Sequence, residues 1–109
     1  MINFNGTLID TDNEGYLTNL NEWSPEVAAH IASNEGVELT EPHWEIIRLI
    51  RQFYQTFNLS PAMRPLVKYA HQNLGPDKGK SVYLLMLFPG SPPKLAAKIA
   101  GLPRPANCL

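Results

Sequence analysis

The chain has 109 residues and a mass of 12.2 kDa, the size of one domain with a single modest core. It is 44% hydrophobic with a formal net charge of −1, which excludes an intrinsically disordered chain. The longest strictly apolar run, Leu84 to Phe88, is far too short to cross a bilayer. The sequence therefore predicts a globular protein that does not enter a membrane.

The charges divide sharply between the two halves of the chain. All nine Lys and Arg residues follow Ile47, and every Asp and Glu residue except Asp77 precedes Arg48. Such a division fits an anionic partner for the basic half, or neutralisation of one half by the other within the fold. The sequence alone leaves both interpretations open.

The N-terminus and the single cysteine indicate where the protein works. The first residues carry neither the basic nor the apolar segment of a secretory signal. Cys108 has no second cysteine with which to form an intrachain disulfide, so we expect a cytoplasmic protein. Cys108 and the three histidines lack the spacing of zinc ligands, and we expect no metal site.

The first elements in chain order are a hairpin and a helix. Residues 2–9 alternate around Asn5-Gly6, a dipeptide typical of a tight β-hairpin turn. A second short extended segment is expected over residues 16–20. Ser24-Pro25-Glu26 then predicts a helix start, with a capping serine, a proline and an acid, and Gly36 a helix end.

The strongest helical pattern runs from Thr40 to Asn58. The aromatic and aliphatic residues with core spacing in it are Trp44, Ile47, Ile50, Phe53, Tyr54 and Phe57. Ser60-Pro61 predicts the cap of the next helix, in which Pro65 must either cause a kink or mark the effective start. We expect a helix-turn-helix-like pair joined by about three residues.

The C-terminal part is expected to hold an apolar helix over residues 81–88 and a short helix over residues 94–100. Residues 101–109 contain two prolines and too few apolar side chains to pack on their own. The predicted fold is therefore mainly α: a small helical bundle with a short N-terminal β-hairpin. We expect one domain over residues 1–100 and a mobile C-terminal arm over residues 101–109.

The predicted helix pair suggests one function. Arg64 and Lys68 lie four residues apart on one helix face, where they could contact phosphates as in helix-turn-helix DNA binding. They could equally pair with the acidic half, and helical bundles commonly contain such junctions. Motifs of serine hydrolases, zinc proteases and phosphate-binding loops do not occur in the sequence.

Cys108 is the sharpest functional candidate. Most cysteines are buried and inert, but this one is the penultimate residue of a proline-bounded tail, and chain ends are usually exposed. The residues after Gly101 can reach roughly 30 Å when extended, and Pro103 and Pro105 favour an extended path. A lone thiol fits a carrier better than a dithiol redox centre. The alternative is a terminal cysteine without function.

Several segments resemble the DsrC/TusE family. The most specific are KIAGLPRP at residues 98–105 followed by Cys108-Leu109, DNEGYL at residues 12–17, and HWE at residues 43–45. Further matching residues are Arg48, Phe53-Tyr54, Phe57-Asn58, Ser60-Pro61-Ala62, Arg64, Leu66-Val67-Lys68, Tyr83-Leu84 and Leu87-Phe88-Pro89. The resemblance covers essentially the whole chain and implies a mostly helical fold whose C-terminal arm carries a reactive cysteine.

The resemblance also implies a function. Family members of the dissimilatory sulfite reductase type carry a second cysteine where this chain has Ala97, so the difference favours the TusE branch. For that branch the resemblance implies a cytoplasmic sulfurtransferase that accepts persulfide sulfur on Cys108 from a TusBCD-type complex. An MnmA-type tRNA thiouridylase would then receive the sulfur to make wobble 2-thiouridine. The covalent persulfide is the only bound group expected.

Arg104 is the better candidate within the arm for steering the persulfide or docking an acidic partner, and Lys98 is a weaker one. Arg64 and Lys68 form a candidate face for an anion or a partner. The alternatives are a gamma-subunit-type, DsrC-like partner of a sulfite reductase and, less favoured, a helix-turn-helix DNA-binding protein. We expect neither a membrane partner nor direct nucleic-acid binding.

Overall fold

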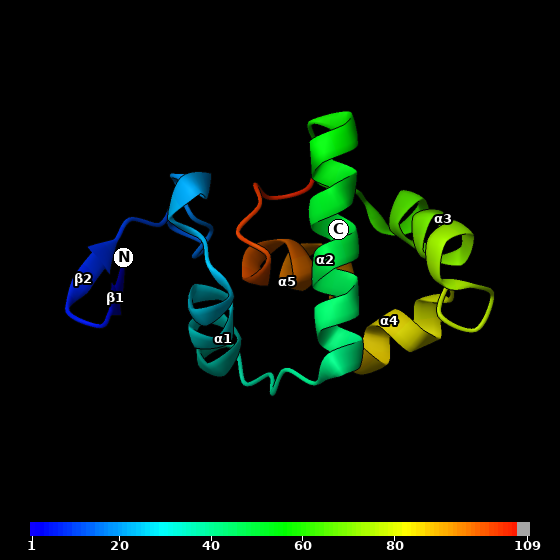
Figure 1. Ribbon diagram of the computed structural model, residues 1–109, viewed down its shortest axis with the longest axis horizontal. Helices are drawn as coiled ribbons and strands as arrows, with labels where there is room; N and C mark the ends of the chain where they lie inside the picture. The colour runs from blue at the N-terminus through cyan, green and yellow to red at the C-terminus, as the bar shows by residue number, and fades with distance from the viewer. Residues whose placement is uncertain (107–109) are drawn as a thin grey trace.

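The computed structural model describes residues 1–106 of the chain. In this part the chain forms five α-helices, one short 3₁₀ helix and a two-stranded sheet. Figure 1 shows the hairpin at one end of an elongated molecule, α3 and α4 at the other end, and α2 upright between them. The prediction of a mainly α bundle with a small N-terminal β element is confirmed.

The N-terminal hairpin consists of β1 (Ile2–Phe4) and β2 (Thr7–Ile9), paired antiparallel with Ile2 opposite Ile9. Asn5 and Gly6 both have positive φ angles, 51° and 81°, as the predicted tight turn requires. The hairpin prediction is therefore confirmed.

The second extended segment, predicted over residues 16–20, is wrong as a strand. Only an isolated bridge joins Thr11 to Leu17, and the chain then enters the 3₁₀ helix η1 (Leu20–Glu22). The side chain of Asn19 accepts the backbone N–H of Asn21 at 3.0 Å and so caps η1. The pairing around the bridge is limited to backbone bonds from Asp12 to Tyr16 at 2.8 Å and from Thr18 to Asp10 at 3.2 Å, and it ends where η1 begins.

Helices α1 (Pro25–Asn34) and α2 (Glu41–Phe57) begin and end close to their predicted limits. Ser24 caps α1, with its hydroxyl oxygen accepting the N–H of Val27 at 3.2 Å. Asn58 ends α2 in the left-handed conformation, with a φ angle of 58°.

Helix α3 (Met63–Leu74) begins later than its sequence suggests. The residue at its N-cap is Ala62, so the predicted cap at Ser60 is wrong, and residues 58–62 form a longer junction than expected. Pro65 lies in the first turn of α3, where backbone N–H groups have no intrahelical acceptor, so its missing N–H interrupts no helical hydrogen bond.

Helices α4 (Ser81–Leu87) and α5 (Pro92–Ile99) complete the described fold. Helix α5 starts two residues before the predicted Lys94, because Pro92 and Pro93 occupy its first turn instead of preceding it. None of the helices in residues 1–106 is both long enough and apolar enough to cross a membrane.

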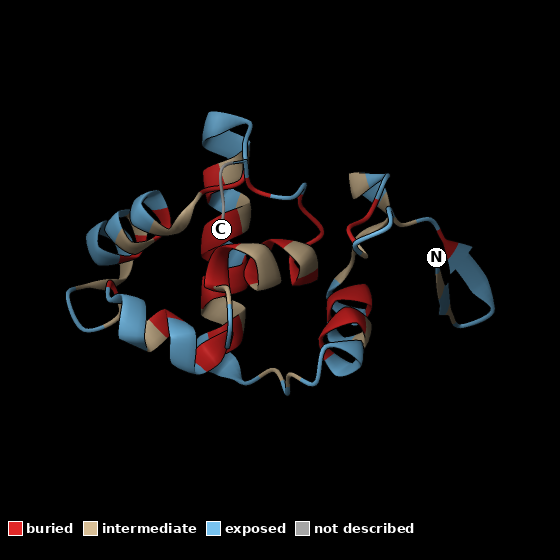
Figure 2. Cartoon of the chain, turned by 180° about the vertical axis from the view of Figure 1, so that it is seen from behind, coloured by how far each residue is buried: buried red, intermediate tan, exposed pale blue. Residues whose placement is uncertain are grey.

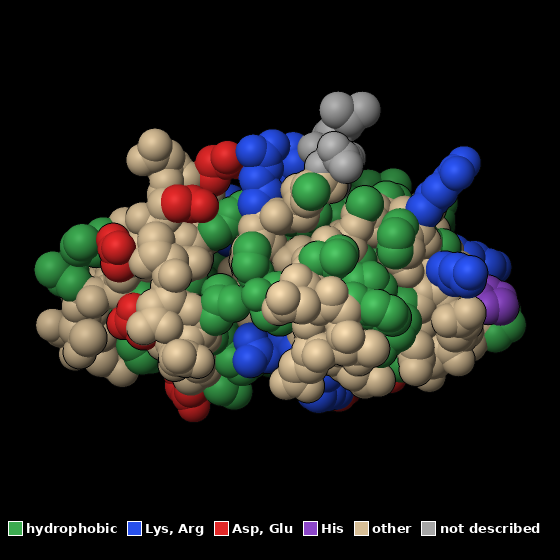
Figure 3. Space-filling model, turned by 90° about the horizontal axis from the view of Figure 1, so that it is seen from above, with side chains coloured by type: hydrophobic (Ala, Val, Ile, Leu, Met, Phe, Trp, Pro, Cys, Tyr) green, Lys and Arg blue, Asp and Glu red, His purple; other side chains and the backbone are tan. Residues whose placement is uncertain are grey.

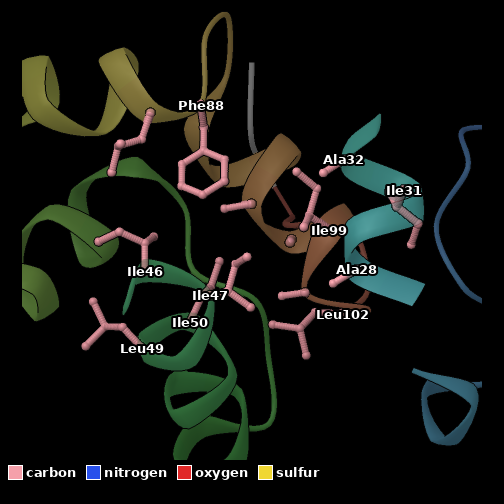
Figure 4. Packing of buried hydrophobic residues seen from close by; sticks show 14 of the residues in the cluster. Ala28, Ile31, Ala32, Ile46, Ile47, Leu49, Ile50, Phe88, Ile99 and Leu102 are labelled. Atoms are coloured by element: carbon pink, nitrogen blue, oxygen red, sulfur yellow. The ribbon is translucent and has the colours of Figure 1, made fainter. Parts of the chain in front are cut away.

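The core is built around α5, which packs against each of the other four helices. Figure 4 shows side chains from α1, α2 and α5 meeting there, and Figure 2 shows the buried faces turned inward. The fully buried large aliphatic and aromatic residues include Ile46, Ile47, Ile50, Leu66, Leu84, Phe88 and Ile99. Phe57 is a wrong core prediction: it is 51% exposed at the end of α2, where its ring contacts Phe53 and Tyr69.

Candidate functional site

The predicted reactive residue, Cys108, lies outside the described residues. What the structure shows is the segment that leads to it, residues 101–106, here called the arm base. Within it Gly101, Leu102 and Pro105 are buried. Figure 4 shows Leu102 among side chains of α1 and α2, so the arm base lies against the body of the molecule.

The arm base leaves α5 through a defined helix-ending turn. Gly101 has a φ angle of 73°, and its N–H donates to the carbonyl of Lys98 at 3.2 Å. The N–H of Leu102 donates to the carbonyl of Ala97 at 2.9 Å. These two bonds form the Schellman pattern, which satisfies carbonyls that would lack donors at a helix end and fixes the direction in which the chain leaves.

Three side chains distant in sequence hold the next carbonyls, and we call them the clamp: Trp23, Arg51 and Ser60. The indole N–H of Trp23 donates to the carbonyl of Ile99 at 2.8 Å, and Nη1 of Arg51 donates to that of Ala100 at 2.6 Å. The hydroxyl of Ser60 donates to the carbonyl of Pro103 at 2.6 Å. Side chains from other elements therefore hold the chain at the end of α5 and at Pro103 within the arm base.

The clamp is itself tightly packed. The guanidinium carbon of Arg51 lies 3.8 Å from the centre of the Trp23 ring, in a cation–π arrangement. Burial lowers the pKa of Arg51, but a guanidinium titrates so high that the side chain stays charged. A Cβ on Gly101 would lie 2.6 Å from Cγ of Trp23, so only glycine allows this close approach.

Arg104 and Lys98 each have an acidic partner inside the chain. Nη1 of Arg104 lies 2.9 Å from Oε1 of Glu14, and both side chains are about half exposed. Nζ of Lys98 lies 3.0 Å from Oε1 of Glu35, and 5.2 Å from the ring centre of Tyr16. The structure thus brings both predicted steering residues to the loop of residues 12–17.

The loop of residues 12–17 is one of the segments that resemble the DsrC/TusE family. It lies against a second such segment, residues 98–105. Asp12 shapes the loop by accepting the backbone N–H groups of Glu14 and Tyr16 at 2.8 and 3.0 Å. The hydroxyl of Tyr16 donates to the carbonyl of Lys94 at 3.3 Å, which ties the loop to α5. Two segments far apart in sequence therefore form one surface next to the arm base.

The charge division is partly neutralised within the fold. In residues 1–106 the structure contains four ion pairs, and each joins an acid that precedes Arg48 to a base of the later half. The pairs are Glu14–Arg104, Glu35–Lys98, Glu41–Arg48 and Glu45–Lys78. Figure 3 nevertheless shows acidic side chains gathered toward the hairpin end and basic ones over the middle and the α3–α4 end.

Arg64 and Lys68 are not part of the arm surface. They are exposed on α3 and line a groove between α3 and α4, to which no residue of the arm base contributes. Neither side chain makes a hydrogen bond or ion pair with a described residue. Residues 1–106 contain no group of three His, Cys, Asp or Glu side chains that could hold a metal ion.

Sequence reasoning missed the roles of the clamp residues. It predicted a helix cap at Ser60 and no contact with the chain end for Trp23 or Arg51. A signal for Arg51 does exist, because it stands four residues after Ile47 and three before Tyr54, on the inward stripe of α2. An arginine on such a stripe indicates a buried acceptor.

Comparison with known proteins agrees with this geometry. A family model described as "DsrC like protein" matches residues 3–109, so the chain belongs to the DsrC-like family. "Sulfurtransferase TusE" of Yersinia pestis is 54% identical over 109 residues, covering all of both chains. These findings confirm the predicted family and the prediction of a sulfurtransferase.

Solved structures of the family share the fold. The solution structure of DsrC from Allochromatium vinosum superposes with a TM-score of 0.88 at 45% identity, covering 99% of this chain and 96% of that one. The oxidized gamma-subunit of the dissimilatory sulfite reductase from Archaeoglobus fulgidus gives a TM-score of 0.82 at 38% identity, covering 95% of each chain.

Proposed function

We propose that this chain is a sulfur carrier that takes persulfide sulfur onto Cys108 from a TusBCD-type complex. It passes the sulfur to an MnmA-type tRNA thiouridylase for wobble 2-thiouridine synthesis in the cytoplasm. The observation that carries the proposal is the clamp, which anchors the chain as far as Pro103, five residues before the lone cysteine. The full-length similarity to a sulfurtransferase supports the same function.

The transfer step is a thiol–persulfide exchange. The thiolate of Cys108 attacks the outer sulfur of a donor persulfide, R–S–S–H. The donor S–S bond breaks, the donor leaves as a thiolate, and Cys108 becomes Cys–S–S–H with the proton on the outer sulfur. Atoms and charge balance, and no external oxidant or reductant is needed. The same exchange, with the Cys108 persulfide as the donor, delivers the sulfur to the acceptor.

The anchored arm base shortens the predicted reach of the thiol. With the chain free after Gly101 the cysteine could travel roughly 30 Å, but the last hydrogen bond of the clamp holds Pro103, five residues before Cys108. Five residues span at most about 18 Å. Partners must therefore dock close to the arm base, and the carrier works by docking and a short movement.

Arg104 is suited to meet a charged partner. Its ion pair with Glu14 is about half exposed, and such pairs contribute at most about 1 kcal/mol, so a partner carboxylate or persulfide can replace Glu14 at small cost. Lys98 is less suited, because its side chain is only 19% exposed and is held between Glu35 and Tyr16. We therefore assign the steering role to Arg104.

The alternative is a gamma-subunit-type partner of a sulfite reductase. The TM-score of 0.88 with a DsrC structure favours it, since the two folds are closely similar. Ala97 speaks against it: this residue is fully buried in α5, and it takes the place of the second cysteine that the resemblance associates with that type. A single thiol suits a carrier better.

The test is intact mass after incubation with a cysteine desulfurase, cysteine and the TusBCD-type complex. The unmodified chain is expected to gain the mass of one sulfur atom and to lose it when the thiouridylase and tRNA are added. Cys108→Ser is a matched control, since the chain has no other cysteine. Equal gain by both chains, or no gain by either, contradicts the proposal. Binding to a sulfite reductase without sulfur gain would favour the alternative.

A further inference from the structure

The arm surface does not explain the groove between α3 and α4. It has a volume of about 440 Å³. Its walls are lined by Met63, Arg64, Val67, Lys68, His71, Gln72, Gly79 and Ser81. Gly79 allows the connection between the helices to lie directly on α3, because a Cβ there would overlap the backbone and Cβ of His71. The close contact between Gly79 and His71 therefore defines one wall of the groove.

An exposed apolar strip lies on α4, the helix whose first residue, Ser81, lines the groove. Val82 and Met86 are 78% and 68% exposed, and Leu85 beside them is 40% exposed. Residues three and four apart share a helix face, so these three side chains form one stripe, and Ser81 at its start lines the groove. A seven-residue helix that exposes three large apolar side chains on one face is typical of a docking surface.

The rim of this surface is basic. Arg64 and Lys68 stand four residues apart on α3 without a partner among the described residues, and Lys80 precedes α4. The acidic side chains near this surface are Asp77 and Glu45, and Glu45 is already paired with Lys78 at 2.7 Å. Figure 3 shows basic side chains and a histidine gathered at this end. The surface is therefore complementary to an occupant with apolar side chains flanked by carboxylates.

The groove also lies next to the arm along the chain. Helix α3 begins three residues after Ser60, the clamp residue that holds the carbonyl of Pro103. Three residues span at most about 11 Å, so Met63 at one end of the groove lies within that distance of Ser60, and a protein seated there is close to the clamp. Given the short tether to Cys108, this is the position that a partner exchanging sulfur with the cysteine needs.

We propose that the α3–α4 groove docks an acidic, amphipathic segment of the sulfur-donor protein. The inference rests on the proposed carrier function and names the partner surface for its loading step. We assign the groove to the sulfur donor and not to the sulfur acceptor. The groove is basic and attracts an acidic partner, whereas an acceptor that binds tRNA needs a basic surface of its own. An apolar stripe with a basic rim binds an amphipathic helix through its spaced apolar side chains, and the charges set orientation and rate.

The test compares two loading reactions. Arg64→Gln/Lys68→Gln removes two positive charges from the rim, while Gln52→Glu/Gln55→Glu on the exposed face of α2 changes the net charge by the same amount away from the groove. With the TusBCD-type complex as donor, the groove variant is expected to raise the apparent KM for the carrier about tenfold, with kcat little changed. The control should stay within about twofold, and added salt should reduce the difference.

A second pair of variants and a second donor keep the outcomes separate. Val82→Gln/Met86→Gln, which keeps good helix formers at exposed positions, should raise the same KM. A small-molecule persulfide should load all variants equally, because it needs no docking; if the unmodified chain fails there too, the carrier function is wrong. If that loading succeeds but groove variants keep an unchanged KM with the protein donor, the docking site is wrong. Weakened tRNA binding with unchanged loading would instead assign the groove to RNA.

Discussion

Replacing Gly101 with alanine tests whether the close approach of the arm base to Trp23 holds the structure together. Gly101 has a φ angle of 73°, a conformation that costs a residue with a side chain about 1–2 kcal/mol. Its new Cβ would also lie 2.8 Å from Cβ of Trp23, and the indole must move. That movement loses the hydrogen bond to Ile99, worth about 1 kcal/mol, and the stacking of Arg51, worth about 0.5–1 kcal/mol.

The expected loss for Gly101→Ala is therefore about 2.5–4 kcal/mol in the free energy of unfolding. Gly36→Ala is the matched control, because Gly36 has nearly the same φ angle, 74°, and an added Cβ meets nothing within 4 Å. It should lose only the backbone cost, about 1–2 kcal/mol. Urea denaturation followed by circular dichroism measures both. Equal destabilisation of the two variants would refute the role assigned to Trp23.

Three further predictions concern single contacts. Ser60→Ala should destabilise the chain by about 1 kcal/mol in urea denaturation, because the carbonyl of Pro103 loses its hydrogen-bond donor. An unchanged free energy of unfolding would contradict that hydrogen bond. Arg104→Gln should change the free energy of unfolding by less than about 1 kcal/mol yet slow persulfide transfer, whereas a purely structural role predicts unchanged transfer. The hydrogen bond that Lys78 donates to Glu45 raises the pKa of Lys78, so Glu45→Gln should lower that pKa in an NMR titration. An unmoved pKa would contradict the pair.

The helices could be predicted because their signals are local. Ser24-Pro25 marks the start of α1, and the apolar spacing from Trp44 onward marks α2, since burial of one face follows directly from helix periodicity. The start of α3 could not be predicted in the same way. Ser60 reads as a helix cap, but its hydroxyl instead bonds Pro103, a residue that sequence places far away.

The arm base shows why the site was only partly predictable. The lone cysteine and its proline-bounded tail are visible in the sequence and indicate a carrier thiol. The clamp is not visible, because Trp23 and Arg51 meet the end of α5 only after the whole chain has folded. A composition with two prolines and little apolar surface suggested a segment that cannot pack. Leu102 and Pro105 pack nonetheless, since the body of the molecule provides the surface.

The charge division has two different structural consequences. Near the arm base the acids of the N-terminal half hold the bases: Glu14 meets Arg104 and Glu35 meets Lys98. On α3, Arg64 and Lys68 have no such acid among the described residues. A chain with a net charge of −1 thus presents a locally basic face. Because exposed ion pairs contribute little to folding, moderate salt should leave stability nearly unchanged while it slows loading by an acidic donor.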